Sequence, residues 1–242
     1  MIIGVLDSGL GGLTTLKEMI KAKVSDNFIY YADNLNAPYG SKSKEEIERC
    51  VKDSCDFLLK RGAEALVLAC NTATSSVINK LRRELNIPVF GLEPAIRPAL
   101  EGATEPVLVL ATEYTLKGEK WRELTELFSG EYRIKPLPRL ASLIDCFYPE
   151  TQIIEEYLQH ELADFCNAGR VVLGCTHYIL VKDSIKKTIP NAVTFDGNVG
   201  LSKLLSRLFY SPARSIDVDI EFSGEKEYAR YAEILGALVE HS

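Results

Sequence analysis

Two cysteines occupy matching positions in this chain, each at the end of an apolar run and directly before polar residues. Cys70 follows the run 65–69, and Cys175 follows the run 171–174. Short apolar runs that lead into helical patterns predict parallel strands, whose carboxyl ends face the ligand cleft. A thiol placed there meets the positive end of the following helix. We therefore expect a lowered thiol pKa at both sites, which suits general acid–base catalysis.

The spacing of the two cysteines recurs elsewhere in the chain. Residues 70 and 175 are 105 positions apart, and the same offset relates Asp7 to Thr112, each of which ends an earlier apolar run. A repeated offset is typical of internal duplication, although apolar strands also resemble one another by composition. Duplication predicts two similar α/β domains that face each other, each contributing one cysteine to a shared cleft.

Two thiols on opposite faces of a small molecule suit inversion at a carbon atom. One thiolate would remove a proton, and the opposite thiol would return one from the other side. A dithiol redox couple would instead need Cα atoms within about 7 Å of each other, and cysteine proteolysis needs one nucleophile with a histidine base. A lyase or decarboxylase that uses one cysteine stays open as an alternative, as does a non-catalytic binding role.

A glycine-rich turn, Gly9-Leu10-Gly11-Gly12, follows Asp7-Ser8 at the end of the first apolar run. It is no dinucleotide-binding fingerprint, because Thr14 stands where the third glycine belongs, and it lacks the lysine of a phosphate-binding loop. Backbone N–H groups at a helix start favour an anion such as a carboxylate. The alternative is a tight turn without a ligand.

The elements that would position these residues alternate between short strands and amphipathic helices. We expect strands at 2–6, 28–32, 66–69, 88–91, 107–111, 133–137, 171–174, 193–195 and 216–222, and helices at 13–20, 43–62, 77–85, 115–128, 153–165 and 225–239. This order predicts an α/β fold with two similar, pseudo-symmetric domains, each a parallel sheet flanked by helices, and an active site in the interdomain cleft. The first domain would comprise 1–96 plus 208–242 and carry Asp7 and Cys70, and the second would comprise 97–207 and carry Cys175 and His177.

Composition narrows the class of protein. The chain has 242 residues, 28 Lys and Arg against 34 Asp and Glu, and a net charge of −6. Without a basic cluster we expect no nucleic-acid partner. Without a secretory signal or a membrane-length apolar run we expect a cytosolic protein away from membranes. Three histidines and no CxxC argue against a metal site. The remaining cysteines are expected to be free and to pack as small hydrophobic residues; these are Cys50, Cys55, Cys146 and Cys166.

Five segments together resemble the motifs of the glutamate racemases, in the same order along the chain. They are residues 4–12 (GVLDSGLGG), 38–40 (PYG), 69–73 (ACNTA), 93–95 (EPA) and 173–178 (LGCTHY). The resemblance implies a racemase that needs no cofactor and interconverts L- and D-glutamate, supplying D-glutamate for peptidoglycan, cell-wall biogenesis and cell shape. It leaves the oligomeric state open, with a homodimer as one expectation.

The resemblance also implies roles for individual residues. Cys70 and Cys175 would be the two acid/base residues, and Asp7 and His177 would assist them. The substrate would be held by Asp7, Ser8, Tyr39, Gly40, Asn71, Thr72, Thr176 and His177. Asp145 stands where the family often has a glutamate, so its contact with substrate is an expectation that the shorter side chain weakens. Aspartate or another acidic amino acid is therefore an alternative substrate.

Overall fold

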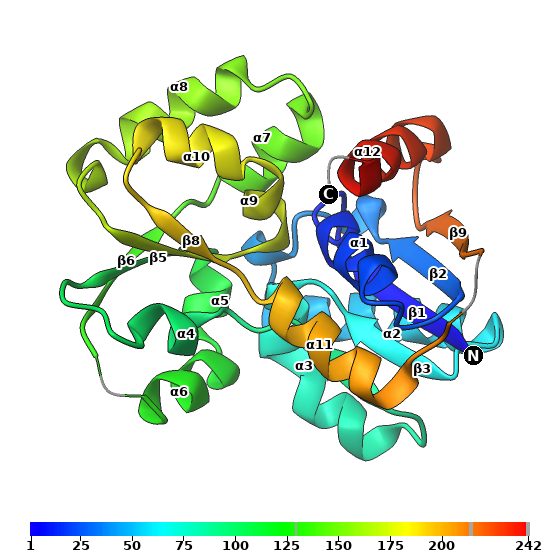
Figure 1. Ribbon diagram of the computed structural model, residues 1–242. Coiled ribbons are helices and arrows are strands. Elements are labelled where there is room, and N and C mark those ends of the chain that lie inside the picture. The colour runs from blue at the N-terminus through cyan, green and yellow to red at the C-terminus, as the bar shows by residue number, and fades with distance from the viewer. Residues whose placement is uncertain (129, 213–214, 241–242) are drawn as a thin grey trace.

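A computed structural model describes residues 1–128, 130–212 and 215–240 and contains two parallel sheets (Figure 1). The first sheet has the order β4-β3-β1-β2-β9 and the second β6-β5-β7-β8. The strands of the first are β1 (Ile2–Asp7), β2 (Asn27–Ala32), β3 (Ala65–Leu68), β4 (Val89–Gly91) and β9 (Asp217–Phe222). Those of the second are β5 (Val107–Ala111), β6 (Tyr132–Pro136), β7 (Arg170–Gly174) and β8 (Val193–Phe195). All the strand pairs of these two sheets in the described ranges are parallel, which confirms the predicted fold class.

Helices follow most strands and cover the sheets. They are α1 (Leu13–Lys21), α2 (Lys44–Lys60), α3 (Asn71–Glu84), α4 (Ile96–Leu100), α5 (Glu113–Lys117), α6 (Glu119–Glu126), α7 (Leu140–Phe147), α8 (Gln152–Glu161), α9 (Thr176–Leu180), α10 (Lys182–Thr188), α11 (Asn198–Phe209) and α12 (Tyr228–Glu240). In the part of the chain that the structure describes, three 3-10 turns complete the elements: η1 (Asn34–Asn36), η2 (Tyr39–Ser41) and η3 (Ala163–Phe165). Ser43 and Glu46 form a capping box at the start of α2, which satisfies N–H groups without intrahelical partners. The helix expected over 115–128 is divided at Gly118, whose extended backbone separates α5 from α6.

The two sheets are built alike. When β1, β2, β3 and β4 are matched to β5, β6, β7 and β8, the two sheets have the same strand order. The first sheet has one additional edge strand, β9. The register of β1 with β2 agrees with that of β5 with β6, because Ile2 pairs with Asn27 and Val107 pairs with Tyr132. These two pairs are related by the same 105-position offset as the two cysteines (2 to 107 and 27 to 132). The register of β1 with β3 differs by one position from that of β5 with β7, because Ile3 pairs with Ala65 and Leu108 pairs with Val171. Sheet order and the register of β1 with β2 thus agree with an internal duplication.

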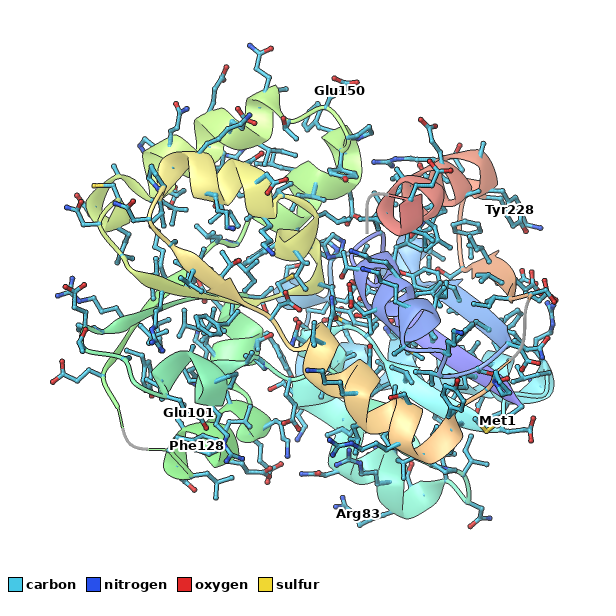
Figure 2. All side chains as sticks on the ribbon, viewed as in Figure 1. Met1, Arg83, Glu101, Phe128, Glu150 and Tyr228 are labelled. Atoms are coloured by element: carbon cyan, nitrogen blue, oxygen red, sulfur yellow. The ribbon has the colours of Figure 1, made fainter. Side chains whose placement is uncertain are left out.

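Near its C-terminus the chain contacts the first sheet through both α11 and β9. Leu201 and Leu205 of α11 are buried in the core that α1 and α12 also line, and β9 pairs with β2. The division into two domains stays a prediction. Side chains from both halves fill the region between the sheets (Figure 2).

The four cysteines other than Cys70 and Cys175 divide into a buried pair and an exposed pair. All six cysteines are free, and Cys50 and Cys55 are buried as expected, where burial raises the pKa of the Cys55 thiol to about 12. The expectation of burial is wrong for Cys146 and Cys166, which are exposed. Cys146 lies two positions after Ile144, which belongs to the buried stripe of α7, so the helical repeat turns its side chain toward the opposite face. Within the described ranges, no helix is long and apolar enough to cross a membrane.

Candidate active site

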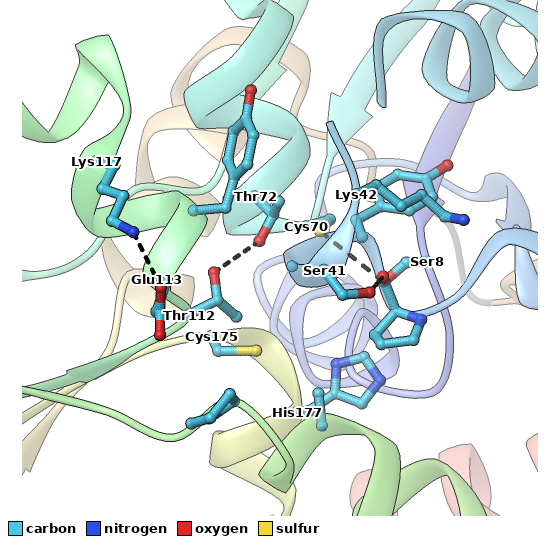
Figure 3. Close-up of a pocket in the computed structure, with 16 residues that line it drawn as sticks. Ser8, Ser41, Lys42, Cys70, Thr72, Thr112, Glu113, Lys117, Cys175 and His177 are labelled. Carbon is cyan, nitrogen blue, oxygen red and sulfur yellow. Dashed lines mark hydrogen bonds and ion pairs between the residues drawn. The ribbon is translucent and has the colours of Figure 1, made fainter. Parts of the chain in front are cut away.

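The carboxyl ends of strands from both sheets meet at a cavity of about 380 Å³ (Figure 3). Seven of the predicted site residues line it: Ser8, Tyr39, Gly40, Cys70, Thr72, Cys175 and His177. The first five come from the half built on the first sheet, and Cys175 and His177 come from the other half. A volume of this size lies at the lower end for pockets that enclose a small molecule.

The two cysteines reach this cavity from equivalent positions. Cys70 directly precedes α3, and Cys175 directly precedes α9. Their exposed fractions are 6% and 7%, so each thiol is nearly enclosed while still lining the cavity. Figure 3 shows them on ribbons from different halves, with Ser8 and His177 beside them. The Ser8 hydroxyl oxygen lies 3.9 Å from the Cys70 sulfur.

The electrostatic environment of Cys70 differs from the expected one. Burial, and then the nearby charge of Asp7, raise the pKa of the Cys70 thiol well above its ordinary value. The predicted lowering by the helix dipole is therefore wrong for this residue, because desolvation of a thiolate outweighs the dipole of α3. The raised pKa favours the protonated thiol form of Cys70.

Asp7 lies behind the cavity wall. Its carboxylate accepts hydrogen bonds from the Gly9 N–H at 2.9 Å and from the Thr176 hydroxyl at 3.1 Å. Burial raises the pKa of Asp7, and the charge of His177 opposes that rise. Neither Asp7 nor Thr176 lines the cavity. Their hydrogen bond instead joins the end of β1 to the start of α9, and so links the two halves beside Cys175.

His177 and Asp145 form a pair at the same junction. The Nε2 atom of His177 lies 2.9 Å from Oδ1 of Asp145, and the Leu10 N–H donates to the same oxygen at 3.3 Å. Burial by itself would lower the pKa of His177, but the charge and hydrogen bond of Asp145, with a smaller contribution from Cys175, raise it well above 6.5. The raised pKa favours the imidazolium form of His177, two positions after Cys175. Asp145 is its partner and does not line the cavity.

This pair makes stability depend on pH. The folded pKa of His177 lies above its unfolded value of about 6.5. The contribution of the pair is therefore complete below about pH 6.5 and is lost as the pH rises through the folded pKa. We expect Asp145→Asn to lower the free energy of unfolding by about 1.5–3 kcal/mol near pH 6, with a smaller difference from wild type at alkaline pH. Denaturant unfolding of both proteins across this range measures the difference.

The control for this experiment is His160→Asn, because the His160 side chain is 86% exposed. We expect it to change stability little at any pH. A difference between wild type and Asp145→Asn that stays constant or widens as the pH rises would contradict the assignment of a charged pair.

The other predicted ligand residues separate into two groups. The Thr72 hydroxyl lies 3.0 Å from that of Thr112, and the Tyr39 hydroxyl donates to Asp33 at 2.5 Å. Both Thr72 and Tyr39 line the cavity. Asn71 does not: its side-chain N–H donates to the Leu92 carbonyl at 3.2 Å. Its buried side-chain oxygen has no hydrogen-bond partner among the described residues.

Several residues that line the cavity were assigned no role from the sequence. They are Pro38, Ser41, Lys42, Thr112, Glu113, Tyr114, Lys117, Pro138 and Ala141. The 105-position offset could have identified Thr112, since it is the counterpart of Asp7. Lys117 and Glu113 form an ion pair at 3.0 Å on one turn of α5, and no motif in the sequence marks them.

Comparison with known proteins places this architecture among racemases. A family model described as Asp/Glu/Hydantoin racemase matches residues 3–199. A protein named glutamate racemase from Campylobacter curvus is 40% identical over 244 aligned positions, covering 94% of this chain and 92% of the relative. One of the same name from Halothermothrix orenii is 39% identical, covering 99% and 100%.

Solved structures agree over both sheets. The glutamate racemase isoform RacE1 of Bacillus anthracis superposes with a TM-score of 0.82 at 26% identity, covering 99% of this chain and 94% of that one. Escherichia coli glutamate racemase in complex with L-glutamate and the activator UDP-MurNAc-Ala gives a TM-score of 0.81 at 26% identity, with the same coverage.

Proposed function

The chain belongs to the Asp/Glu/Hydantoin racemase family, and from this premise we propose that it is a glutamate racemase with Cys70 and Cys175 as its two acid/base residues. The observation that carries the proposal is the convergence of two thiols, from equivalent strand ends of two similar sheets, on one small cavity. Relatives about 40% identical over nearly the whole chain bear the name glutamate racemase, which supports the choice of substrate.

In the proposed reaction, one cysteine removes the α-proton of glutamate as a thiolate, and the carbon becomes a planar carbanion. The opposite thiol then gives its proton to the other face, so the C–H bond is remade with inverted configuration and the thiolate has changed sides. Cys70, which holds its proton, serves as the acid when Cys175 acts as the base. The His177 cation attracts negative charge on the Cys175 sulfur. For the other enantiomer the two cysteines exchange roles.

The carbanion needs electrostatic stabilisation, since the α-proton of an amino acid is very weakly acidic. Hydroxyl groups of Ser8, Thr72 and Thr112 line the cavity and can donate hydrogen bonds to a carboxylate as its negative charge grows. Lys42 also lies on the lining and favours an anionic substrate, whereas the charge of Lys117 is paired with that of Glu113. This combination fits a dicarboxylic amino acid better than a neutral one.

The proposal predicts exchange of the α-proton with solvent. In D₂O, we expect the protein without added cofactor to incorporate deuterium at the α-carbon of either enantiomer of glutamate while the circular dichroism signal decays to zero. NMR and circular dichroism measure the two processes. No exchange and no signal change with pure L-glutamate would contradict the proposal. Higher kcat/KM for aspartate would favour the alternative substrate, and exchange with net loss of a carboxyl group would favour a one-base decarboxylase.

The wider role follows from the product. We propose that the chain supplies D-glutamate for peptidoglycan and hence for the cell wall and cell shape, and that it works in the cytoplasm without a cofactor. Growth of a strain that requires D-glutamate, when it carries this gene, tests the supply. Assembly as a homodimer stays a prediction, which light scattering tests.

A further inference from the structure

Arg230 of α12 lies against the C-terminal end of α7. Its Nη2 atom donates to the Asp145 carbonyl at 2.6 Å and to the Tyr148 carbonyl at 3.0 Å. Its Nη1 atom donates at 3.0 Å to Glu227, the residue directly before α12. The last carbonyls of a helix have no partner within the helix, and a cation there also complements the negative end of the helix dipole. Arg230 therefore caps α7.

This cap joins the two halves of the molecule. Helix α12 packs in the core of the first sheet through Tyr231 and Ile234, whereas α7 packs in the core of the second through Leu140 and Ile144. The two helices lie next to each other at the boundary between the halves (Figure 1). Movement of one half against the other would strain the Arg230 contacts.

Helix α7 connects this cap to the cavity. At its beginning, Ala141 lines the cavity. In its last turn, Asp145 lies 2.9 Å from His177, and His177 lines the cavity beside Cys175. Arg230 binds the backbone carbonyl of the residue whose side chain binds His177. A shift in the last turn of α7 would thus move the Asp145 carboxylate away from the imidazole.

We propose that Arg230 is a positioning residue for catalysis: by fixing the last turn of α7, it holds Asp145 against His177 and thereby sets the charge beside Cys175. The inference rests on the proposed function of the cavity. Arg230 does not line the cavity, so it acts only through α7. Arginine suits this task because one planar guanidinium reaches two carbonyls and a carboxylate at once, which a lysine ammonium matches poorly.

The test compares Arg230→Met, Arg230→Lys and Arg170→Met in the full chain. Arg170 is a matched control, because it donates to the carbonyls of Ala99 and Glu101 at 2.9 and 2.7 Å. It lies at the opposite end of β7 from Cys175. Both methionine variants keep the aliphatic stem and lose the hydrogen bonds. Three quantities are measured for each variant: kcat and KM for glutamate, the NMR titration of His177, and Tm.

We expect Arg230→Met to lower kcat about 10- to 100-fold with a much smaller change in KM, because misplacement of a catalytic group by about 1 Å costs up to 100-fold. The His177 titration should move to lower pH as Asp145 loosens, while Cys175 and Asp7, the other titratable groups that face it, stay in place. Arg230→Lys should recover part of both effects. Arg170→Met should lower Tm only.

A purely structural role would give a different pattern. If Arg230→Met lowers Tm as Arg170→Met does and leaves kcat and the His177 titration unchanged, the proposal is overturned. If Arg230→Met does not fold, Arg230→Lys decides: wild-type kcat and titration would overturn the proposal, and intermediate values would support it. If the wild-type protein does not racemise glutamate, the proposed function fails, yet the His177 titration still tests the positioning role.

Discussion

Replacing either Cys70 or Cys175 by serine should abolish racemisation, with kcat reduced at least about 1000-fold in each variant. General acid or base catalysis contributes roughly 100- to 10,000-fold per group, and each direction of the proposed reaction uses both thiols, one as base and one as acid. A serine hydroxyl keeps the shape of the side chain but exchanges a proton far less readily near neutral pH. Circular dichroism, starting from each pure enantiomer, measures the loss.

Isotope exchange separates the two cysteines. A variant with one remaining thiol should still exchange the α-proton of the enantiomer whose proton points at that thiol, without inversion. The two variants should therefore show opposite preferences. Cys55→Ser is the control, because Cys55 is buried in α2 away from the cavity, and it should keep wild-type kcat. Full racemisation by either active-site variant would refute the two-thiol mechanism.

Gly11→Ala is expected to damage both activity and stability. A Cβ atom at Gly11 would lie 2.5 Å from the His177 backbone nitrogen, 2.5 Å from the Thr176 hydroxyl and 2.6 Å from His177 Nδ1. Such distances force the glycine-rich turn and the start of α9 apart. We expect kcat to fall about 100-fold, as for other small misplacements of catalytic groups. The free energy of unfolding should fall by about 1–3 kcal/mol, as for overpacked interiors.

The matched control is Gly236→Ala in α12. Nothing lies within 4 Å of a Cβ atom at this position, and alanine in a helix interior is favoured over glycine by about 0.5–1 kcal/mol. This variant should therefore be slightly more stable than wild type, with unchanged kcat. Steady-state kinetics and denaturant unfolding of both variants measure the contrast. Wild-type activity in Gly11→Ala would show that catalysis does not depend on the close contact between the glycine-rich turn and α9.

The sequence predicted most of the strands well because they are short, nearly continuous apolar runs, whereas β9 was predicted from its alternation of apolar and acidic residues. Buried parallel strands such as β5 and β7 require such runs, and the intervening helical patterns imply parallel crossovers. The offset between Cys70 and Cys175 also predicted that similar sheets would bring both thiols to one cleft. Short helices such as α4 and α7 were missed, because one or two turns leave too few residues for a periodic signal.

The chemistry of the site was less predictable, because it depends on burial and on contacts between distant segments. The pKa of Cys70 rises rather than falls, since the enclosure of its thiol and the approach of Asp7 are tertiary features. Asp145 turned out to be the partner of His177, a contact across 32 positions that no local pattern reveals. The side chain of Asn71 turns toward Leu92, although its backbone position matches the expected motif.

The duplication is unequal at one position, and this has a thermodynamic consequence. Asp7 ends β1, whereas its counterpart Thr112 follows the end of β5, so one strand end carries a buried carboxyl group and the equivalent strand end carries a hydroxyl group. Mirror-image substrates have equal free energies in water, and both directions of turnover pass through the same barriers. The specificity constants kcat/KM for L- and D-glutamate are then equal at every pH. If this asymmetric environment gives one enantiomer a higher kcat, that enantiomer must also have a proportionally higher KM.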